Sequence, residues 1–139
     1  MRLRHIPGSE EFVRRASATV NEPERYRGKW SAFFREDAPL ALEIGMGKGR
    51  FLRELSAREP ERNFLGLERY ASVLQKAIER KEREEREQGK RERENLYFLW
   101  EDAKRLTELF VPGEVARIYL NFSDPWPKAG HAMRRLTSS

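Results

Sequence analysis

"LEIGMGKGRF", residues 42–51, carries an apolar run into three glycines spaced two apart and then into a helical pattern. Glycine lets the backbone turn tightly and lets a ligand approach the main chain. The start of a helix adds unpaired N–H groups at the same place. The stretch therefore predicts a buried strand, a ligand-binding turn and a helix. A glycine-rich turn that binds nothing is the simpler alternative.

The same alternation continues along the chain. Strand-like apolar runs lie at 40–44, 63–68, 94–100 and 115–122, and helical patterns lie at 49–59, from 71 onward and at 103–110. Strands that alternate with helices predict an α/β fold with a mostly parallel, doubly wound sheet, here of about four strands. The first helical pattern has Phe51, Leu52 and Leu55 at helical spacing before Pro60.

Composition limits the classes of protein that fit. With 139 residues, the chain suits one domain, and it has no cysteine, which excludes disulfides and cysteine zinc sites. No apolar stretch approaches the roughly 20 residues of a membrane span. We expect a cytoplasmic monomer or homodimer without metal or membrane partner.

The positive charge lies at the two ends of the chain. Residues 1–35 carry eight Arg or Lys against four Glu, and Lys128, Arg134 and Arg135 have no acid among them. Basic clusters favour polyanions such as nucleic acid, although they also serve solubility alone. Residues 79–94 carry seven charges of each sign, which favours a solvated helical extension over a nucleic-acid arm.

Three acids follow the ends of predicted strands. Glu43 precedes the glycines, Glu68 closes the second strand, and Asp102 follows the third. Glu68 could accept hydrogen bonds from ribose hydroxyls, and Asp102 could accept from an adenine amino group or cap the helix that begins at residue 103. A nicotinamide-dinucleotide fingerprint would need glycine where Arg50 stands. The acid-first glycine order instead resembles the first motif of class I S-adenosylmethionine-dependent methyltransferases.

"YLNFSDPWPK", residues 119–128, ends the fourth predicted strand in a stiff turn. Its two prolines restrict the backbone, so Asp124 and Trp126 are held with little conformational freedom. Ligands of open α/β sheets bind beyond the carboxyl ends of strands. A carboxylate beside an aromatic ring suits a planar base such as guanine, whereas a rigid surface turn with an incidental tryptophan is the alternative.

The whole chain resembles the bacterial tRNA (guanine-N7-)-methyltransferases, through "MRLRHIPG", "YRGKW", "LEIGMGKG", "FLGLE" and above all "NFSDPWPK". The resemblance implies methyl transfer from S-adenosylmethionine to N7 of a guanosine in the tRNA variable loop. It divides the chain into a basic N-terminal lead-in, 1–37, and a partial Rossmann-like methyltransferase domain, 38–139.

The resemblance and the motifs together give the expected site. The cofactor-binding residues are Glu43, Gly45, Gly47, Gly49, Glu68, Asp102, Ala103 and Asp124. Asp124 is also the catalytic residue. The substrate-binding residues are Trp126, Lys128, His131, Arg134 and Arg135, helped by Arg2, Arg4, Arg14 and Arg15.

The chain departs from the family's pattern in two places. Ala129, Gly130, Ala132 and Met133 stand where the family usually carries bases. The family's later strands and a further substrate-contacting acid are not found after "RRLTSS", so the chain is interpreted as a truncated form. A non-catalytic module that binds only the cofactor or RNA is therefore the alternative function.

Overall fold

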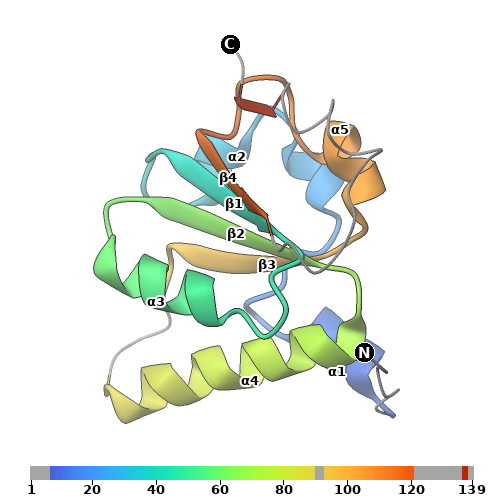
Figure 1. The fold of residues 1–139 in the computed structure, drawn as a ribbon, viewed down its shortest axis with the longest axis vertical. Helices are drawn as coiled ribbons and strands as arrows, with labels where there is room; N and C mark the ends of the chain where they lie inside the picture. The colour runs from blue at the N-terminus through green and yellow to red at the C-terminus, as the bar shows by residue number, and fades with distance from the viewer. Residues whose placement is uncertain (1–6, 90–92, 121–135, 138–139) are drawn as a thin grey trace.

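A four-stranded parallel sheet organises the molecule. The computed structural model describes residues 7–89, 93–120 and 136–137. The strand order is β3-β2-β1-β4, as Figure 1 shows. The strands are β1 (Leu40–Ile44), β2 (Asn63–Glu68), β3 (Leu96–Trp100) and β4 (Arg117–Leu120). The predicted four strands are confirmed, and the order reverses between β1 and β4, where open sheets place their ligand crevice.

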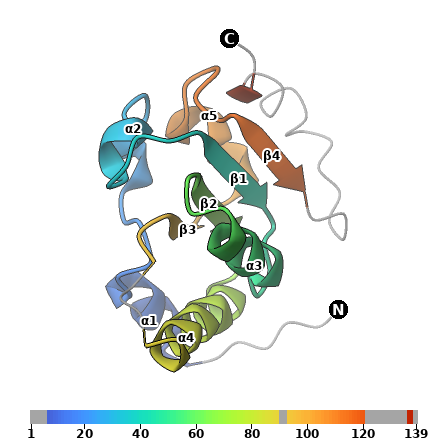
Figure 2. The same cartoon turned by 90° about the vertical axis from the view of Figure 1, so that its left-hand side faces the viewer.

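Helices cover both faces of this sheet (Figure 2). On one face lie α1 (Ser9–Arg15), α3 (Arg50–Arg58) and α4 (Ala71–Glu87). The other face carries α2 (Trp30–Phe33), α5 (Leu106–Leu109), η1 (Pro23–Tyr26) and η2 (Ala103–Arg105). Side chains alternate along a strand, so each strand supplies both cores. The doubly wound arrangement is therefore confirmed.

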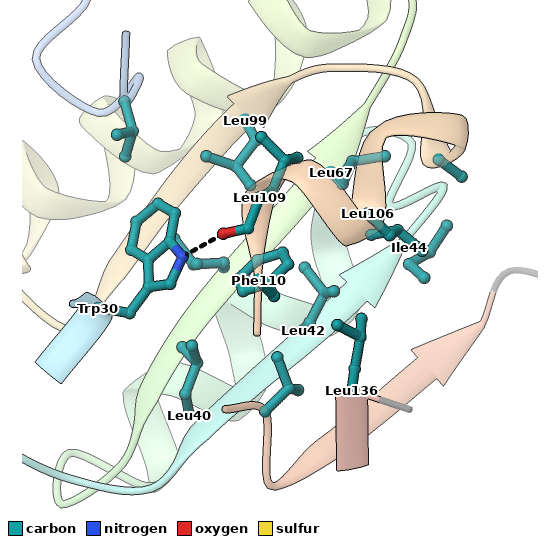
Figure 3. Packing of buried hydrophobic residues seen from close by; sticks show 14 of the residues in the cluster. Trp30, Leu40, Leu42, Ile44, Leu67, Leu99, Leu106, Leu109, Phe110 and Leu136 are labelled. Carbon is teal, nitrogen blue, oxygen red and sulfur yellow. Dashed lines mark hydrogen bonds between the residues drawn. The ribbon is translucent and has the colours of Figure 1, made fainter. Parts of the chain in front are cut away.

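Trp30 anchors the core on the face that carries α2 and α5. Its side chain is buried, and the indole N–H donates to the carbonyl oxygen of Leu109 at 2.8 Å (Figure 3). Its ring stacks on Phe110 with centroids 5.5 Å apart. A buried tryptophan needs a partner for its N–H, and this one ties the N-terminal segment to the chain before β4.

The N-terminal segment forms part of the same body. Phe98 N–H donates to Ala18 O at 2.8 Å, and Val20 N–H donates to Phe98 O at 2.9 Å, so residues 18–20 run along the outer edge of β3. Helix α1 packs against α4. The sequence did not predict α1 or α2, because helices this short depend on tertiary contacts rather than on their own pattern.

The charged run after residue 79 is less solvated than expected. Lys81 Nζ lies 2.8 Å from Glu85 Oε2, and both side chains of this α4 pair are buried. Glu84 forms ion pairs with Arg53 of α3 and with Arg93. The prediction of a solvated extension is thus wrong for this stripe, because Lys81 pairs with Glu85 within α4 and Glu84 pairs with Arg53 of α3.

Candidate functional site at the carboxyl edge of the sheet

The glycine turn between β1 and α3 is held in a left-handed conformation. Gly45, Gly47 and Gly49 have φ values of 71°, 60° and 74°, a region that other residues adopt only with strain. The N–H groups of Gly45 and Met46 both donate to Leu67 O, at 2.9 and 3.1 Å. A Cβ on Gly47 would meet no atom of the described residues within 4 Å, so these residues leave the outer side of the turn open to a ligand.

Glu68, at the end of β2, is hydrogen-bonded to the main chain on both sides. Its Oε1 accepts from Gly47 N–H at 3.1 Å, and its Oε2 accepts from Tyr70 N–H at 3.0 Å. The carboxylate therefore fixes the glycine turn to the segment that begins α4. A carboxylate is an acceptor, the type of group that binds ribose hydroxyls, so the ribose contact stays a prediction.

The carboxyl group of Glu43 is buried near the carboxyl end of β1. Glu43 is paired in register with Gly66 of β2 and with Tyr119 of β4, and only 8% of its surface is exposed. Within the described part of the chain, its Oε1 has no hydrogen-bond partner. Burial raises the pKa of this carboxyl group to about 7. A buried acceptor without a donor is costly, and a ligand that supplies a donor would satisfy it.

Gly66 is a site residue that the sequence did not single out. An added Cβ would lie 2.2 Å from Met46 Sδ and 2.8 Å from Leu52 Cδ1. The missing side chain lets the glycine turn and α3 pack directly on β2, next to Glu43. A lone glycine inside a strand was the available signal, because it often marks such close approach.

Asp102 caps the short helix after β3. Its Oδ1 accepts from Lys104 N–H at 2.9 Å, which confirms the capping alternative. Ala103 beside it is buried. The capping bond leaves acceptor sites on the carboxylate, so the adenine contact stays a prediction.

Phe51 lies on the aromatic side of the site. It stands at helical spacing with Leu52 and Leu55, but it is 43% exposed whereas they are buried. Its ring meets that of Tyr119 edge-on, with centroids 4.9 Å apart. The orientation of α3 explains the difference. Leu52 and Leu55 face the core, whereas Phe51 faces Tyr119 of β4.

The predicted catalytic and substrate residues lie outside the described residues. They are Asp124, Trp126, Lys128, His131, Arg134 and Arg135, with Arg2 and Arg4 at the other end. The described part of β4 ends at Leu120, in register with Ile44 of β1. The last described residue before 121–135 therefore lies next to the glycine turn.

A family model described as "Putative methyltransferase" matches residues 37–139. The chain belongs to this methyltransferase family. Its glycine turn and two strand-end acids therefore occupy the ligand edge of a methyltransferase fold. None of the helices in the described ranges is long and apolar enough to cross a membrane.

Two similar proteins have the name tRNA (guanine-N(7)-)-methyltransferase. That of Lachnoclostridium phytofermentans is 50% identical over 139 residues, all of this chain and 62% of the relative. That of Brevibacillus brevis is 47% identical over 137 residues, 99% of this chain and 61% of the relative. These matches confirm the resemblance read from the sequence. The chain spans about three fifths of the length of these relatives.

A solved structure supports the fold assignment independently. The antibiotic-resistance methyltransferase Kmr superposes with a TM-score of 0.61 at 22% identity, over 81% of this chain and 60% of Kmr. At this identity the likeness concerns the fold alone. It confirms the Rossmann-like class I methyltransferase fold.

Proposed function

We propose that this chain transfers a methyl group from S-adenosylmethionine to N7 of a guanosine in the variable loop of tRNA. The observation that supports the cofactor part is the buried Oε1 of Glu43, which has no hydrogen-bond partner among the described residues and lies beside the glycine turn. The tRNA part draws support from the names of the relatives.

The residues present fit such a cofactor. Among the described residues, Gly47 leaves open space above the turn, and Glu68 holds that turn with a carboxylate, a group that accepts hydrogen bonds from hydroxyls. Glu43 offers a buried acceptor that lacks a donor. The cofactor residues in this proposal are Glu43, Gly45, Gly47, Gly49, Glu68, Asp102, Ala103 and Asp124.

The proposed reaction requires few catalytic groups from the protein. S-adenosylmethionine would supply an electrophilic methyl group when bound. Guanine N7 carries a free lone pair, so no residue has to remove a proton before attack. The chain's task is to position the base in line and to exclude water, which can contribute on the order of 7–11 kcal/mol in the best cases.

Asp124 is the proposed catalytic residue. Methylation at N7 places positive charge on the guanine ring, and a carboxylate held nearby stabilises that charge. Trp126 would pack against the base. Phosphate and loop contacts are assigned to Lys128, His131, Arg134 and Arg135, with support from Arg2, Arg4, Arg14 and Arg15.

Calorimetric titration with S-adenosylmethionine tests the proposal, followed by nucleoside analysis of tRNA incubated with excess protein. We expect cofactor binding that is tighter than binding of a nicotinamide dinucleotide, together with 7-methylguanosine. Cofactor or tRNA binding without 7-methylguanosine would favour the non-catalytic alternative. Absence of cofactor binding would refute the proposal.

A further inference from the structure

Two arginines lie over aromatic rings beside the candidate site, in one connected series. The guanidinium of Arg14 lies 5.0 Å from the ring centroid of Trp100, and that of Arg69 lies 4.6 Å from the ring of Tyr70. Trp100 Nε1–H donates to Arg69 O at 2.9 Å. Tyr70 N–H donates to Glu68 at 3.0 Å. We call Arg14, Trp100, Arg69 and Tyr70 the arginine–aromatic ladder.

The ladder is built from three separate parts of the chain. Arg14 comes from α1, Trp100 ends β3, and Arg69 with Tyr70 joins β2 to α4. Its inner end is bonded to Glu68, which also holds the glycine turn. The ladder therefore extends from the cofactor side of the site across the β3 edge to the surface of α1.

The ladder presents charge that is available to an anion. An arginine stacked on a ring keeps its N–H edges free for phosphate, in a fixed plane. The Arg14 side chain is 61% exposed, and its ion pair with Glu10 is 3.6 Å long. An exposed pair of this kind contributes little and can give way to phosphate. Nearby Glu101 already pairs with Arg105 at 2.7 Å.

The ladder also offers a stacking surface. Among the described residues, the exposed large hydrophobic side chains are Phe51 and Tyr70. Phe51 follows the turn after β1, and Tyr70 follows β2, so both lie at the carboxyl edge of the sheet. Exposed rings with basic neighbours suit unpaired bases, which stack on aromatic side chains while arginines hold the backbone.

We infer that the arginine–aromatic ladder binds a strand of the RNA substrate, with phosphates on Arg14 and Arg69 and a base on Tyr70. This inference rests on the proposed function, because it assumes that the RNA bound by the ladder is the tRNA substrate. It joins Arg14, already expected to support substrate binding, with Trp100, Arg69 and Tyr70 in a contact surface on the β3 side of the site, away from the proposed substrate residues that follow β4. It also gives a reason for α1 to dock on α4, since that docking brings Arg14 to Trp100.

Fluorescence anisotropy with a labelled tRNA transcript tests the ladder, over a series of salt concentrations. We expect Arg14→Gln and Arg69→Gln each to weaken binding roughly 3–10-fold and to lower the salt slope by about one. Tyr70→Leu should weaken binding roughly fivefold or more without changing the slope, because it removes stacking and not charge.

Arg25→Gln is the matched control. Arg25 is an exposed arginine of η1, on the opposite face of the sheet, and it pairs with Glu22 at 3.5 Å. Its replacement makes the same change in net charge, and we expect unchanged tRNA affinity. Circular dichroism and cofactor titration of every variant should match the parent chain. Equal tRNA affinity of the Arg14, Arg69 and Arg25 variants would overturn the inference that the ladder binds RNA.

Two further results separate the ladder from the proposed function. Ladder-dependent tRNA binding by a chain that binds no S-adenosylmethionine would refute methyl transfer and leave the ladder standing. A rate of 7-methylguanosine formation, measured at concentrations too low to saturate tRNA binding, that is unaffected by the Arg14 and Arg69 changes would refute the ladder alone. A polyglutamate peptide that binds through Arg14 and Arg69, where tRNA does not, would show a protein surface and overturn the inference.

Discussion

Glu68 accepts a hydrogen bond from the main-chain N–H of Gly47 at 3.1 Å, so the acid that closes β2 holds the turn that follows β1. Its other oxygen accepts from Tyr70 N–H. One carboxylate therefore fixes both loops around the proposed ribose position. A substitution at Glu68 changes the shape of the site as well as the ligand contact.

Glu68→Ala should weaken S-adenosylmethionine binding by roughly 1.5–3 kcal/mol, the scale of a charged hydrogen bond. It should also lower the melting temperature, because the N–H groups of Gly47 and Tyr70 lose their acceptor. Glu68→Gln is the matched control, since it keeps the shape and one acceptor oxygen, and its losses should be smaller. Calorimetry and thermal unfolding measure the two effects. Unchanged cofactor affinity in Glu68→Ala would show that the ribose lies elsewhere.

Gly66→Ala should destabilise the fold by about 1–3 kcal/mol, the usual cost of overpacking. The added methyl group would lie 2.2 Å from Met46 Sδ, so the glycine turn must move. Adding Met46→Ala should recover part of the loss, and a double-mutant cycle of unfolding free energies would show that coupling. Strictly additive effects of the two changes would contradict the proposed contact.

The strands could be predicted because each is a short apolar run that ends at a turn residue. Both β1 and β2 have the predicted bounds, 40–44 and 63–68, while β3 starts two residues later than predicted. The short helices α1 and α2 could not be predicted. Their stability comes from contacts such as that of Trp30 with Leu109, which link residues far apart in the sequence.

The site could be predicted as a set of residue types but not as a set of contacts. Acids at the ends of parallel strands must share one edge of the sheet, so Glu43 and Glu68 were accessible to sequence reasoning. The unpartnered Oε1 of Glu43, the lack of space at Gly66 and the exposure of Phe51 depend on the packing of α3. No local pattern encodes that packing.

Lys81→Ala should destabilise the fold by about 3–5 kcal/mol, because the buried carboxylate of Glu85 loses its cationic partner and keeps only a main-chain bond from Arg93 N–H among the described contacts. The matched control is Lys76→Ala, at an exposed position of the same helix, which should change the unfolding free energy by less than about 0.5 kcal/mol. Urea unfolding measures both. Similar values for the two variants would mean that the Lys81–Glu85 pair is solvated.

Asp124→Ala should lower the rate of 7-methylguanosine formation roughly 10²-fold or more, as for loss of one preorganised electrostatic group. Asp124→Asn should also be slow, because an amide lacks the charge. Single-turnover assays at saturating S-adenosylmethionine separate this effect from weaker cofactor binding. A near-normal rate in Asp124→Ala would assign Asp124 a structural role.

Glu43 should make the stability of the ligand-free chain depend on pH. Burial raises its pKa from 4.5 to about 7, so between these values the folded state binds a proton that the unfolded state has lost. Stability should therefore fall as pH rises from about 4.5 through 7, by about 3–4 kcal/mol, and then level off. Glu43→Gln removes the titrating group, so this part of the pH dependence should disappear in urea unfolding.

The same carboxyl group should make cofactor binding depend on pH in the opposite direction. The positively charged cofactor prefers the ionised form of Glu43, so binding below about pH 7 must release its proton. Affinity should rise by up to tenfold per pH unit toward pH 7 and then reach a plateau. Calorimetry at pH 6, 7 and 8, in buffers of different ionisation enthalpy, counts the released protons. The Glu43→Gln variant should bind more weakly and release none. If the parent chain and this variant show the same pH dependence, another group titrates on binding and Glu43 does not contact the cofactor's charge.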